Sequence, residues 1–270
     1  MTRHGFPQWQ DLTTLEMRAF AGRDPVVILP LAAIEQHGPH LPLSTDLDIG
    51  LGLLDAAAAR LGDSCAVLML PPMAIGTSME HETFPGTLSL DPETALAVIG
   101  RYGADVARAG ARRLLLCNSH GGNTQVMDLA ALRLRRDHGL LVVKCSYFRL
   151  PPPVDLDLPS GELRHGLHGG AIETAMMLHL TPGSVRIEQC ADNVSGGYRL
   201  EREMTRLGPE GQASFAWLIQ DLHPDGAVGN ALLANPDLGA HLVAHYGAAI
   251  AEVIRDTAAF PLELLRSAQR

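Results

Sequence analysis

The stretch LPLAAIEQHGPHLPLSTDLD, residues 29–48, joins an apolar run to a carboxylate, two histidines and two aspartates. The run at 26–31 is uniformly apolar and of strand length, which predicts a strand buried on both faces. A strand that ends among side chains of metal-ligand type favours a site at the rim of a sheet. A solvated turn rich in Pro and Gly is the alternative that this stretch alone leaves open.

Around this stretch, predicted strands alternate with predicted helices. The strands are expected at 26–31, 66–70, 113–117 and 140–145, and the helices at 48–61, 91–109, 122–138, 170–180 and 239–257. Such alternation predicts right-handed crossovers and a parallel sheet covered by helices on both faces. Ligands of such sheets bind beyond the carboxyl ends of the strands. With no linker or repeat, residues 1–270 are expected to form a single domain.

Composition excludes several classes of function. Lys and Arg number 21 against 30 Asp and Glu, a formal charge of −9, which argues against a nucleic-acid binder. The four cysteines form no C-x-x-C pair, and Cys117 and Cys145 lie within apolar runs, so buried free thiols are expected rather than disulfides or a zinc knuckle. Neither a signal peptide nor a run of 18 apolar residues is apparent, so a cytoplasmic protein without membrane contact is expected.

The opening stretch holds the first candidate site. Glu35 and His37 stand two apart, so in extended backbone their side chains leave on the same side. Asp46 follows a Pro-rich bend, and His120 follows the strand at 113–117. Carboxylates and imidazoles together suit zinc, manganese or iron, and a carboxylate can bridge two ions. Solvated loop residues and a capping Asp are the alternative.

The motif NSHGGN, residues 118–123, is the second candidate. Gly121 and Gly122 open a predicted helix, which allows a ligand to approach the backbone, and the N–H groups there favour an anionic oxygen. A strand-to-helix turn that needs glycine for its dihedral angles is the alternative.

The third candidate is LHGGAIET, residues 167–174. His168 precedes a predicted helix, and Glu173 is a plausible buried acid that needs a partner or a metal. The alternative is an acid that complements the helix dipole.

Two loops complete the expected site. In the loop at 76–90, Ser78 is expected to line the site, and Glu80 and His81 are expected mainly at its rim. The Pro/Gly-rich segment 149–170 is expected to be a loop without a core of its own, of the kind that often forms a lid.

These motifs together resemble the creatininase family. EQHGPHLP with Asp46, FPGT, the GHGGN-like run Ser119–Asn123 and HGGAIET occur in the family's order over nearly the whole chain. The resemblance implies a three-layer α/β/α sandwich with a mostly parallel sheet. It also implies a hydrolytic site with two divalent cations (zinc or manganese, iron in some members) and a homo-oligomer, often a hexamer.

By the same resemblance, Glu35, His37, Asp46 and His120 match metal ligands, Asp46 being the bridge, and His168 and Glu173 match catalytic groups near the substrate. Creatininases carry a further glutamate ligand where this chain has Gly122. Glu173 is the candidate to supply the missing oxygen, and a site with one tightly bound ion is the alternative.

A second departure concerns the substrate. The tryptophans that enclose creatinine correspond to Phe148 and to the neighbourhood of Arg164, which disfavours a flat neutral ring and favours an anionic substrate. The predicted function is metal-dependent hydrolysis of a small cyclic or linear amide, with Ser78, Gly121, Gly122 and Phe148 near the substrate. The alternatives are a formamide hydrolase or small-peptide peptidase of the same family, a metal-dependent lactone hydrolase or isomerase, and a non-catalytic protein whose assembly a metal stabilises.

Overall fold

A four-stranded parallel sheet forms the centre of the computed structural model, which describes residues 5–62 and 64–266. The strand order is β2-β1-β3-β4, and the strands are β1 (Val26–Leu31), β2 (Val67–Met69), β3 (Arg113–Asn118) and β4 (Leu141–Ser146). β1 lies in the middle, with Val26 in register with both Val67 and Arg113. All three strand pairs are parallel, which confirms the predicted sheet.

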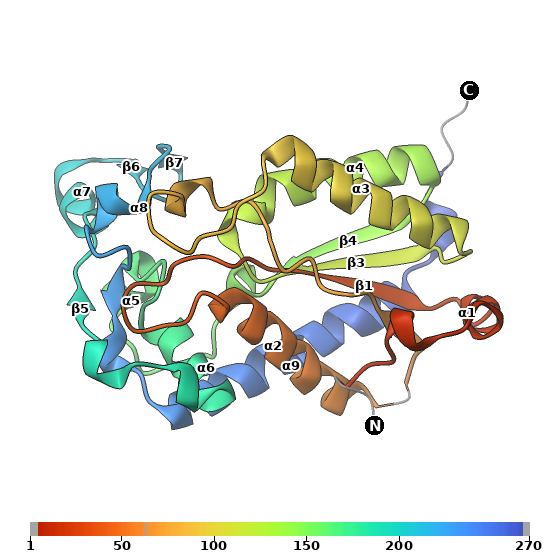
Figure 1. Ribbon diagram of the computed structural model, residues 1–270, viewed down its shortest axis with the longest axis horizontal. Coiled ribbons are helices and arrows are strands. Elements are labelled where there is room, and N and C mark those ends of the chain that lie inside the picture. The colour runs from red at the N-terminus through yellow and green to blue at the C-terminus, as the bar shows by residue number, and fades with distance from the viewer. Residues whose placement is uncertain (1–4, 63, 267–270) are drawn as a thin grey trace.

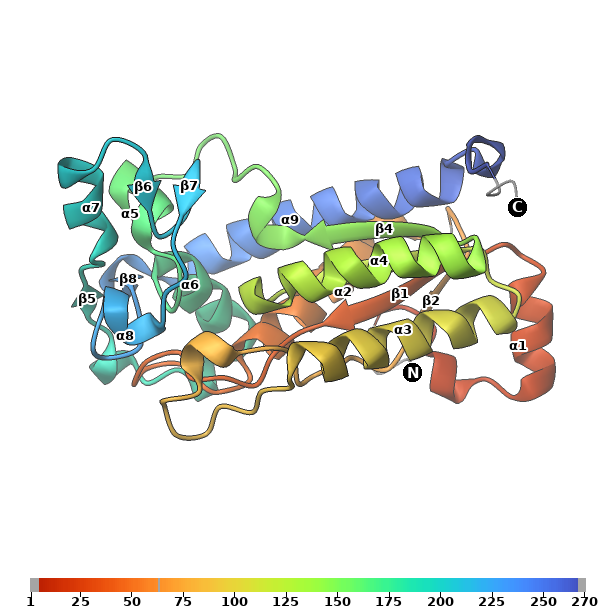
Figure 2. The same cartoon turned by 90° about the horizontal axis from the view of Figure 1, so that it is seen from above.

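Helices cover both faces of this sheet (Figure 1). On one face lie α2 (Thr45–Leu61), α6 (Ala171–Leu180) and α9 (Pro236–Ala259), and on the other lie α3 (Pro92–Arg108) and α4 (Thr124–His138). Seen from above, α3 and α4 run side by side along the sheet (Figure 2). The three-layer sandwich is thereby confirmed.

Alternate side chains of β1 enter two separate cores. Val26 and Ile28 pack with α2, α6 and α9, whereas Val27, Leu29 and Leu31 pack with α3 and α4. Each of these side chains is fully buried. A strand with both faces covered needs a continuous apolar run, and this is why 26–31 lacks the polar alternation of a half-exposed strand.

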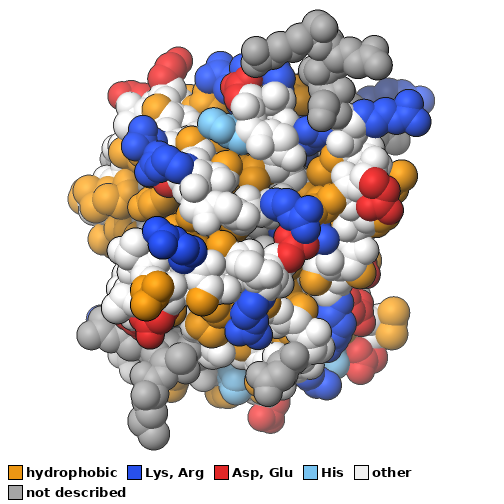
Figure 3. Space-filling model, turned by 90° about the vertical axis from the view of Figure 1, so that its right-hand side faces the viewer, with side chains coloured by type: hydrophobic (Ala, Val, Ile, Leu, Met, Phe, Trp, Pro, Cys, Tyr) orange, Lys and Arg blue, Asp and Glu red, His pale blue; other side chains and the backbone are white. Residues whose placement is uncertain are grey.

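Smaller elements gather beyond the carboxyl ends of the strands, at the left of Figure 1. They are α5 (Ser160–His165), α7 (Gly197–Glu203), α8 (Ile219–Leu222), the antiparallel pair β5 (Asp192–Asn193) and β8 (Gly229–Asn230), and the pair β6 (Leu207–Gly208) and β7 (Ala213–Ser214). At the opposite end, α1 (Thr14–Ala21) precedes β1. That end shows basic, acidic and apolar side chains interspersed (Figure 3).

Three sequence predictions need adjustment. α2 begins at Thr45, three residues early, because Ser44 and Thr45 bond to Asp48 and to the Pro42 carbonyl. A 3-10 turn, Gly121–Asn123, precedes α4. The segment 149–170 is not wholly a loop: it contains α5, whose Glu162 and His165 are buried. No helix within the described residues is long and apolar enough to cross a membrane.

Candidate metal centre

The sequence-predicted ligands meet at the carboxyl ends of β1 and β3. Glu35 and His37 follow β1, Asp46 lies in the first turn of α2, and His120 follows β3. These four side chains are at most 3% exposed. Glu173 reaches the same place from the first turn of α6 and is half-buried. The structure therefore brings together side chains from four separate elements.

One set of three donors consists of Glu35, Asp46 and His120. Nδ1 of His120 lies 3.2 Å from Oε1 of Glu35 and 3.3 Å from Oδ2 of Asp46. The three donor atoms all lie within 4.8 Å of one another. Two carboxylate oxygens and one imidazole nitrogen at this spacing suit a zinc or manganese ion.

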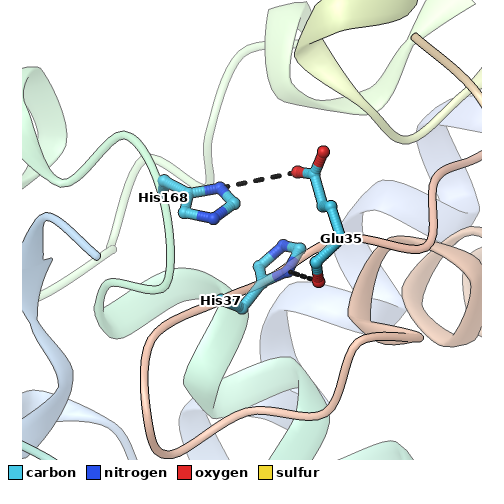
Figure 4. A group of neighbouring side chains, drawn as sticks. All are labelled: Glu35, His37 and His168. Carbon is cyan, nitrogen blue, oxygen red and sulfur yellow. Dashed lines mark hydrogen bonds and ion pairs between the residues drawn. The ribbon is translucent and has the colours of Figure 1, made fainter. Parts of the chain in front are cut away.

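A second set consists of His37, Asp46 and Glu173, again within 4.8 Å. Nε2 of His37 lies 3.6 Å from Oδ1 of Asp46, so the two oxygens of Asp46 face different histidines. Asp46 is thus shared between the two sets, as a bridging carboxylate would be. A third grouping, Glu35, His37 and His168, places Nδ1 of His168 3.8 Å from Oε1 of Glu35 (Figure 4).

Backbone carbonyls orient all three imidazoles. Nδ1–H of His37 donates to the Glu35 carbonyl at 3.1 Å, and Nε2–H of His120 donates to the Thr77 carbonyl at 2.7 Å. Nε2–H of His168 donates to the Gln36 carbonyl at 2.7 Å. Each ring therefore turns its other nitrogen toward the carboxylates, and a hydrogen bond of this kind fixes the nitrogen that a histidine offers to a metal.

The negative charge of the site changes the pKa values of His37 and His120, the two histidines of the donor sets. Burial alone lowers the pKa of His37, but Asp46, Glu173 and Glu35 outweigh burial and raise it to about 9. The pKa of His120 is raised well above its usual value because Glu35 and Asp46 likewise outweigh burial. In the metal-free protein, protons on these rings supply the positive charge that the carboxylates require.

Three buried polar atoms of the site lack a hydrogen-bond partner, and this bears on whether the site fits a cation. Oε2 of Glu35, Nε2 of His37 and Oδ2 of Asp46 are buried and have no hydrogen-bond partner. Buried polar atoms without partners are costly and call for an explanation. Divalent cations fit, because all three atoms belong to residues of the two donor sets.

Glu173 differs from the other carboxylates. Its Oε2 accepts the N–H of Gly169 at 2.6 Å. Burial, with a further contribution from Asp46, raises its pKa to about 7, although His37 opposes the shift. A carboxyl group with this pKa exchanges a proton near neutral pH.

The sequence does not predict the positions of two residues, His81 and Gln36, inside the site. His81 was expected at the rim, but it is 2% exposed and stacks on His168 with ring centroids 4.2 Å apart. Burial lowers its pKa to about 4. Gln36, which no prediction named, donates from Nε2 to the Gly226 carbonyl at 2.6 Å and lies 2.7 Å from Nδ1 of His81. Its place between Glu35 and His37 was the available signal.

The expected substrate residues lie in different surroundings. Ser78 is fully buried, and its hydroxyl lies 3.4 Å from Nε2 of His120. It therefore contacts the ring nitrogen opposite to the one that faces the carboxylates. Gly121 is exposed, and Gly122 is half-buried. Phe148 is 40% exposed and packs edge-on against Tyr147.

Arg164 does not supply a free positive charge to the site. Its Nε lies 3.0 Å from Oε1 of Glu201. Because its charge is paired there, Arg164 does not support the expected preference for an anionic substrate.

The model of the creatininase family, described as creatinine amidohydrolase, matches residues 10–254. The chain belongs to the creatininase family. A mycofactocin precursor peptide peptidase of Mycobacterium tuberculosis is 36% identical over 174 residues, which cover 61% of this chain and 62% of that protein. The match therefore spans less than two thirds of that relative's length.

Two further family members are similar to this chain. A creatinine amidohydrolase of Pseudomonas putida is 34% identical over 193 residues, which cover 66% of this chain and 72% of that protein. A solved structure described as creatininase with manganese has 27% identity and a TM-score of 0.73, and the match covers 94% of this chain and 100% of that one. The creatininase fold of the chain is thus established on both sequence and structure.

Proposed function

We propose that this creatininase-family chain is a metal-dependent hydrolase that cleaves the C–N bond of a small amide and uses two divalent cations, zinc or manganese. One observation carries the proposal: Asp46 belongs to two sets of three donor side chains and turns one oxygen toward His37 and the other toward His120. Glu35, Asp46 and His120 would hold one cation, and His37, Asp46 and Glu173 would hold the other. Glu173 then takes the part of the glutamate that Gly122 replaces.

The cations, when bound, polarise the amide carbonyl and lower the pKa of water from 15.7 to about 7. The chain itself supplies the proton transfers. Because Nε2–H of His168 is held by the Gln36 backbone carbonyl, Nδ1 is the atom that would accept a proton from the attacking water and pass it to the leaving nitrogen. Burial, together with the neighbouring His37 and His81, lowers the pKa of His168 well below its usual value, so the resting ring is neutral and, once protonated, releases the proton readily.

Two other groups assist in this proposal. Glu173, whose pKa is raised to about 7 in the metal-free protein, would give up its proton and bind the second cation as a carboxylate. The backbone N–H groups of Gly121 and Gly122, directly after His120, are assigned to the developing oxyanion. Phe148, partly exposed, is assigned to the substrate.

The relatives support two classes of amide. The mycobacterial protein is named as a peptidase and the Pseudomonas protein as a creatinine amidohydrolase. We favour a linear amide or short peptide over creatinine, because Phe148 stands where creatininases enclose the ring with tryptophan. A homo-oligomer, with the hexamer favoured, is part of the same proposal, and size-exclusion chromatography with light scattering tests it.

The experiment is a hydrolysis screen of the zinc- or manganese-loaded protein. The substrates are creatinine, other cyclic amides, formamides, short peptides and lactones. We expect chelator-sensitive amide hydrolysis, best on a linear substrate. Creatinine as the best substrate would refute the argument from Phe148. Bound metal without turnover of any substrate would favour the non-catalytic assembly protein, and turnover of lactones alone would favour the lactone hydrolase.

A further inference from the structure

Glu162 is a buried carboxylate whose partners are backbone groups. It lies in α5 and is 5% exposed. Oε1 accepts the N–H of Ala171 and Oε2 accepts the N–H of Asn230, both at 2.8 Å. The basic side chains of the same helix, Arg164 and His165, pair with Glu201 instead. The carboxylate therefore joins α5 to the first residue of α6 and to β8.

Three glycines make room for this carboxylate. A Cβ atom added at Gly166, Gly170 or Gly229 would lie 2.4, 2.6 or 2.8 Å from Oε1 of Glu162. Only a backbone without side chains approaches a carboxylate so closely on three sides. The N–H of Ala171 is also one of the groups that a helix start leaves without an internal partner. The three glycines therefore leave a space that the Glu162 carboxylate fills.

The same turn carries two residues of the metal centre. The N–H of Val228 donates to the His168 carbonyl at 2.8 Å, two residues before the Asn230 that Glu162 binds. Gly169 N–H donates to Glu173, and Nε2–H of His40 donates to the Gly169 carbonyl at 2.9 Å. Glu173 itself lies two residues after Ala171. The Glu162 bonds therefore hold both sides of the turn from which His168 and Glu173 extend.

We infer that Glu162 is a positioning residue: its carboxylate fastens the segment 149–170 to the start of α6 and so holds Glu173 beside His37 and Asp46. This inference rests on the proposed function for its consequence at the second donor set. The first set, Glu35, Asp46 and His120, comes from the loop after β1, from α2 and from the end of β3, whereas Glu162 itself bonds to Ala171 and Asn230. Loss of the Glu162 bonds therefore affects one cation and spares the other.

Hydrogen–deuterium exchange of the metal-free full chain tests directly whether the Glu162 bonds restrain these two segments. Glu162→Gln keeps the shape but leaves one backbone N–H facing an amide N–H. We expect amides in 166–176 and 226–232 to exchange at least about tenfold faster, with β1 and β3 unchanged. Glu201→Gln is the matched control, because it loosens α5 only from its exposed side. Wild-type exchange in both segments would overturn the inference.

Zinc titration by calorimetry tests the consequence for the site. Glu162→Gln should weaken the second equivalent by about 10–100-fold and leave the first unchanged, as loss of an outer partner typically does. Glu201→Gln should match the wild type, and Glu173→Gln should lose the second equivalent. An unchanged second equivalent in Glu162→Gln would contradict the positioning role.

Two further outcomes need their own measurements: a Glu162→Gln protein that does not fold, and a wild-type protein that binds fewer than two zinc ions. If Glu162→Gln does not fold, Glu162→Asp replaces it: its carboxylate is one methylene shorter and cannot reach both Ala171 and Asn230. Wild-type protein that binds fewer than two equivalents would count against the two-cation proposal, and the exchange result alone would then decide on Glu162.

Discussion

Oδ2 of Asp46 lies 3.3 Å from Nδ1 of His120, and both side chains are shielded from solvent. The first turn of α2 and the end of β3 bring the two together. Because the other oxygen of this carboxylate faces His37, a single side chain serves two donor sets. Both of the proposed cation sites depend on that shared carboxylate.

The metal-free protein should lose stability as the pH rises from about 6.5 to 9. Because the folded-state pKa of His37 is raised from 6.5 to about 9, its stabilising contribution is complete below the unfolded value and is lost as the pH rises through the folded one. Urea unfolding at both ends of this range measures the change, and His37→Asn should flatten it. A wild-type stability that increases over the range would be inconsistent with a protonated His37.

Metal binding should strengthen over the same range of pH. A cation must displace the proton on His37, so binding releases protons and becomes tighter as the pH rises toward 9. Zinc calorimetry in two buffers of different ionisation enthalpy counts the protons released. Binding without proton release near pH 7 would show that the ring is already neutral.

Gly122→Ala should damage the site, and Gly121→Ala should not. A Cβ at Gly122 would lie 2.2 Å from the Thr77 carbonyl oxygen and 2.5 Å from Nε2 of His120, whereas a Cβ at Gly121 meets nothing within 4 Å. The expected loss for Gly122→Ala is about 1–3 kcal/mol of unfolding free energy, together with loss of activity. Thermal unfolding and an activity assay compare the two variants, and equal behaviour would be evidence against the packing seen around His120.

His168→Asn should separate proton transfer from metal binding. Removing the ring should lower kcat by about 10²–10⁴-fold, the usual effect of losing a general acid–base group. Because His168 lies outside the two sets that share Asp46, the metal content should stay at the wild-type value. Loss of metal from this variant would instead make His168 a ligand, through the third grouping with Glu35 and His37.

Phe148→Ala should alter substrate binding with little effect on stability. The side chain is 40% exposed and contacts Tyr147 at its edge, so little apolar surface is lost from the core. We expect KM to rise while the melting temperature stays close to that of the wild type. An unchanged KM would remove Phe148 from the substrate site.

The sheet, and the meeting of the candidate ligands at its edge, could be predicted from the sequence because their signals are local. The run 26–31 is apolar throughout since both of its faces are covered, and parallel strands deliver Glu35 and His120 to the same edge. The helix expected at 91–109 is α3, Pro92–Arg108, with Asp91 as its N-cap and proline at its first position, a start that neighbouring residues determine.

The contacts of the loops at that edge could not be predicted because they join residues far apart in the chain. Nothing near His81 indicates that it stacks on His168, or that Gln36 reaches the Gly226 carbonyl. The helix α5 within 149–170 owes its packing to Glu162, whose backbone partners lie in α6 and β8. Pairing of this kind has no signature in residue spacing.

Elemental analysis of purified wild-type protein and Asp46→Ala, both loaded with zinc and desalted, tests the shared carboxylate most directly. We expect two zinc ions per wild-type chain and loss of metal together with activity in the variant, because each donor set loses one of its three members. A folded Asp46→Ala protein that keeps its full complement of zinc would contradict this expectation.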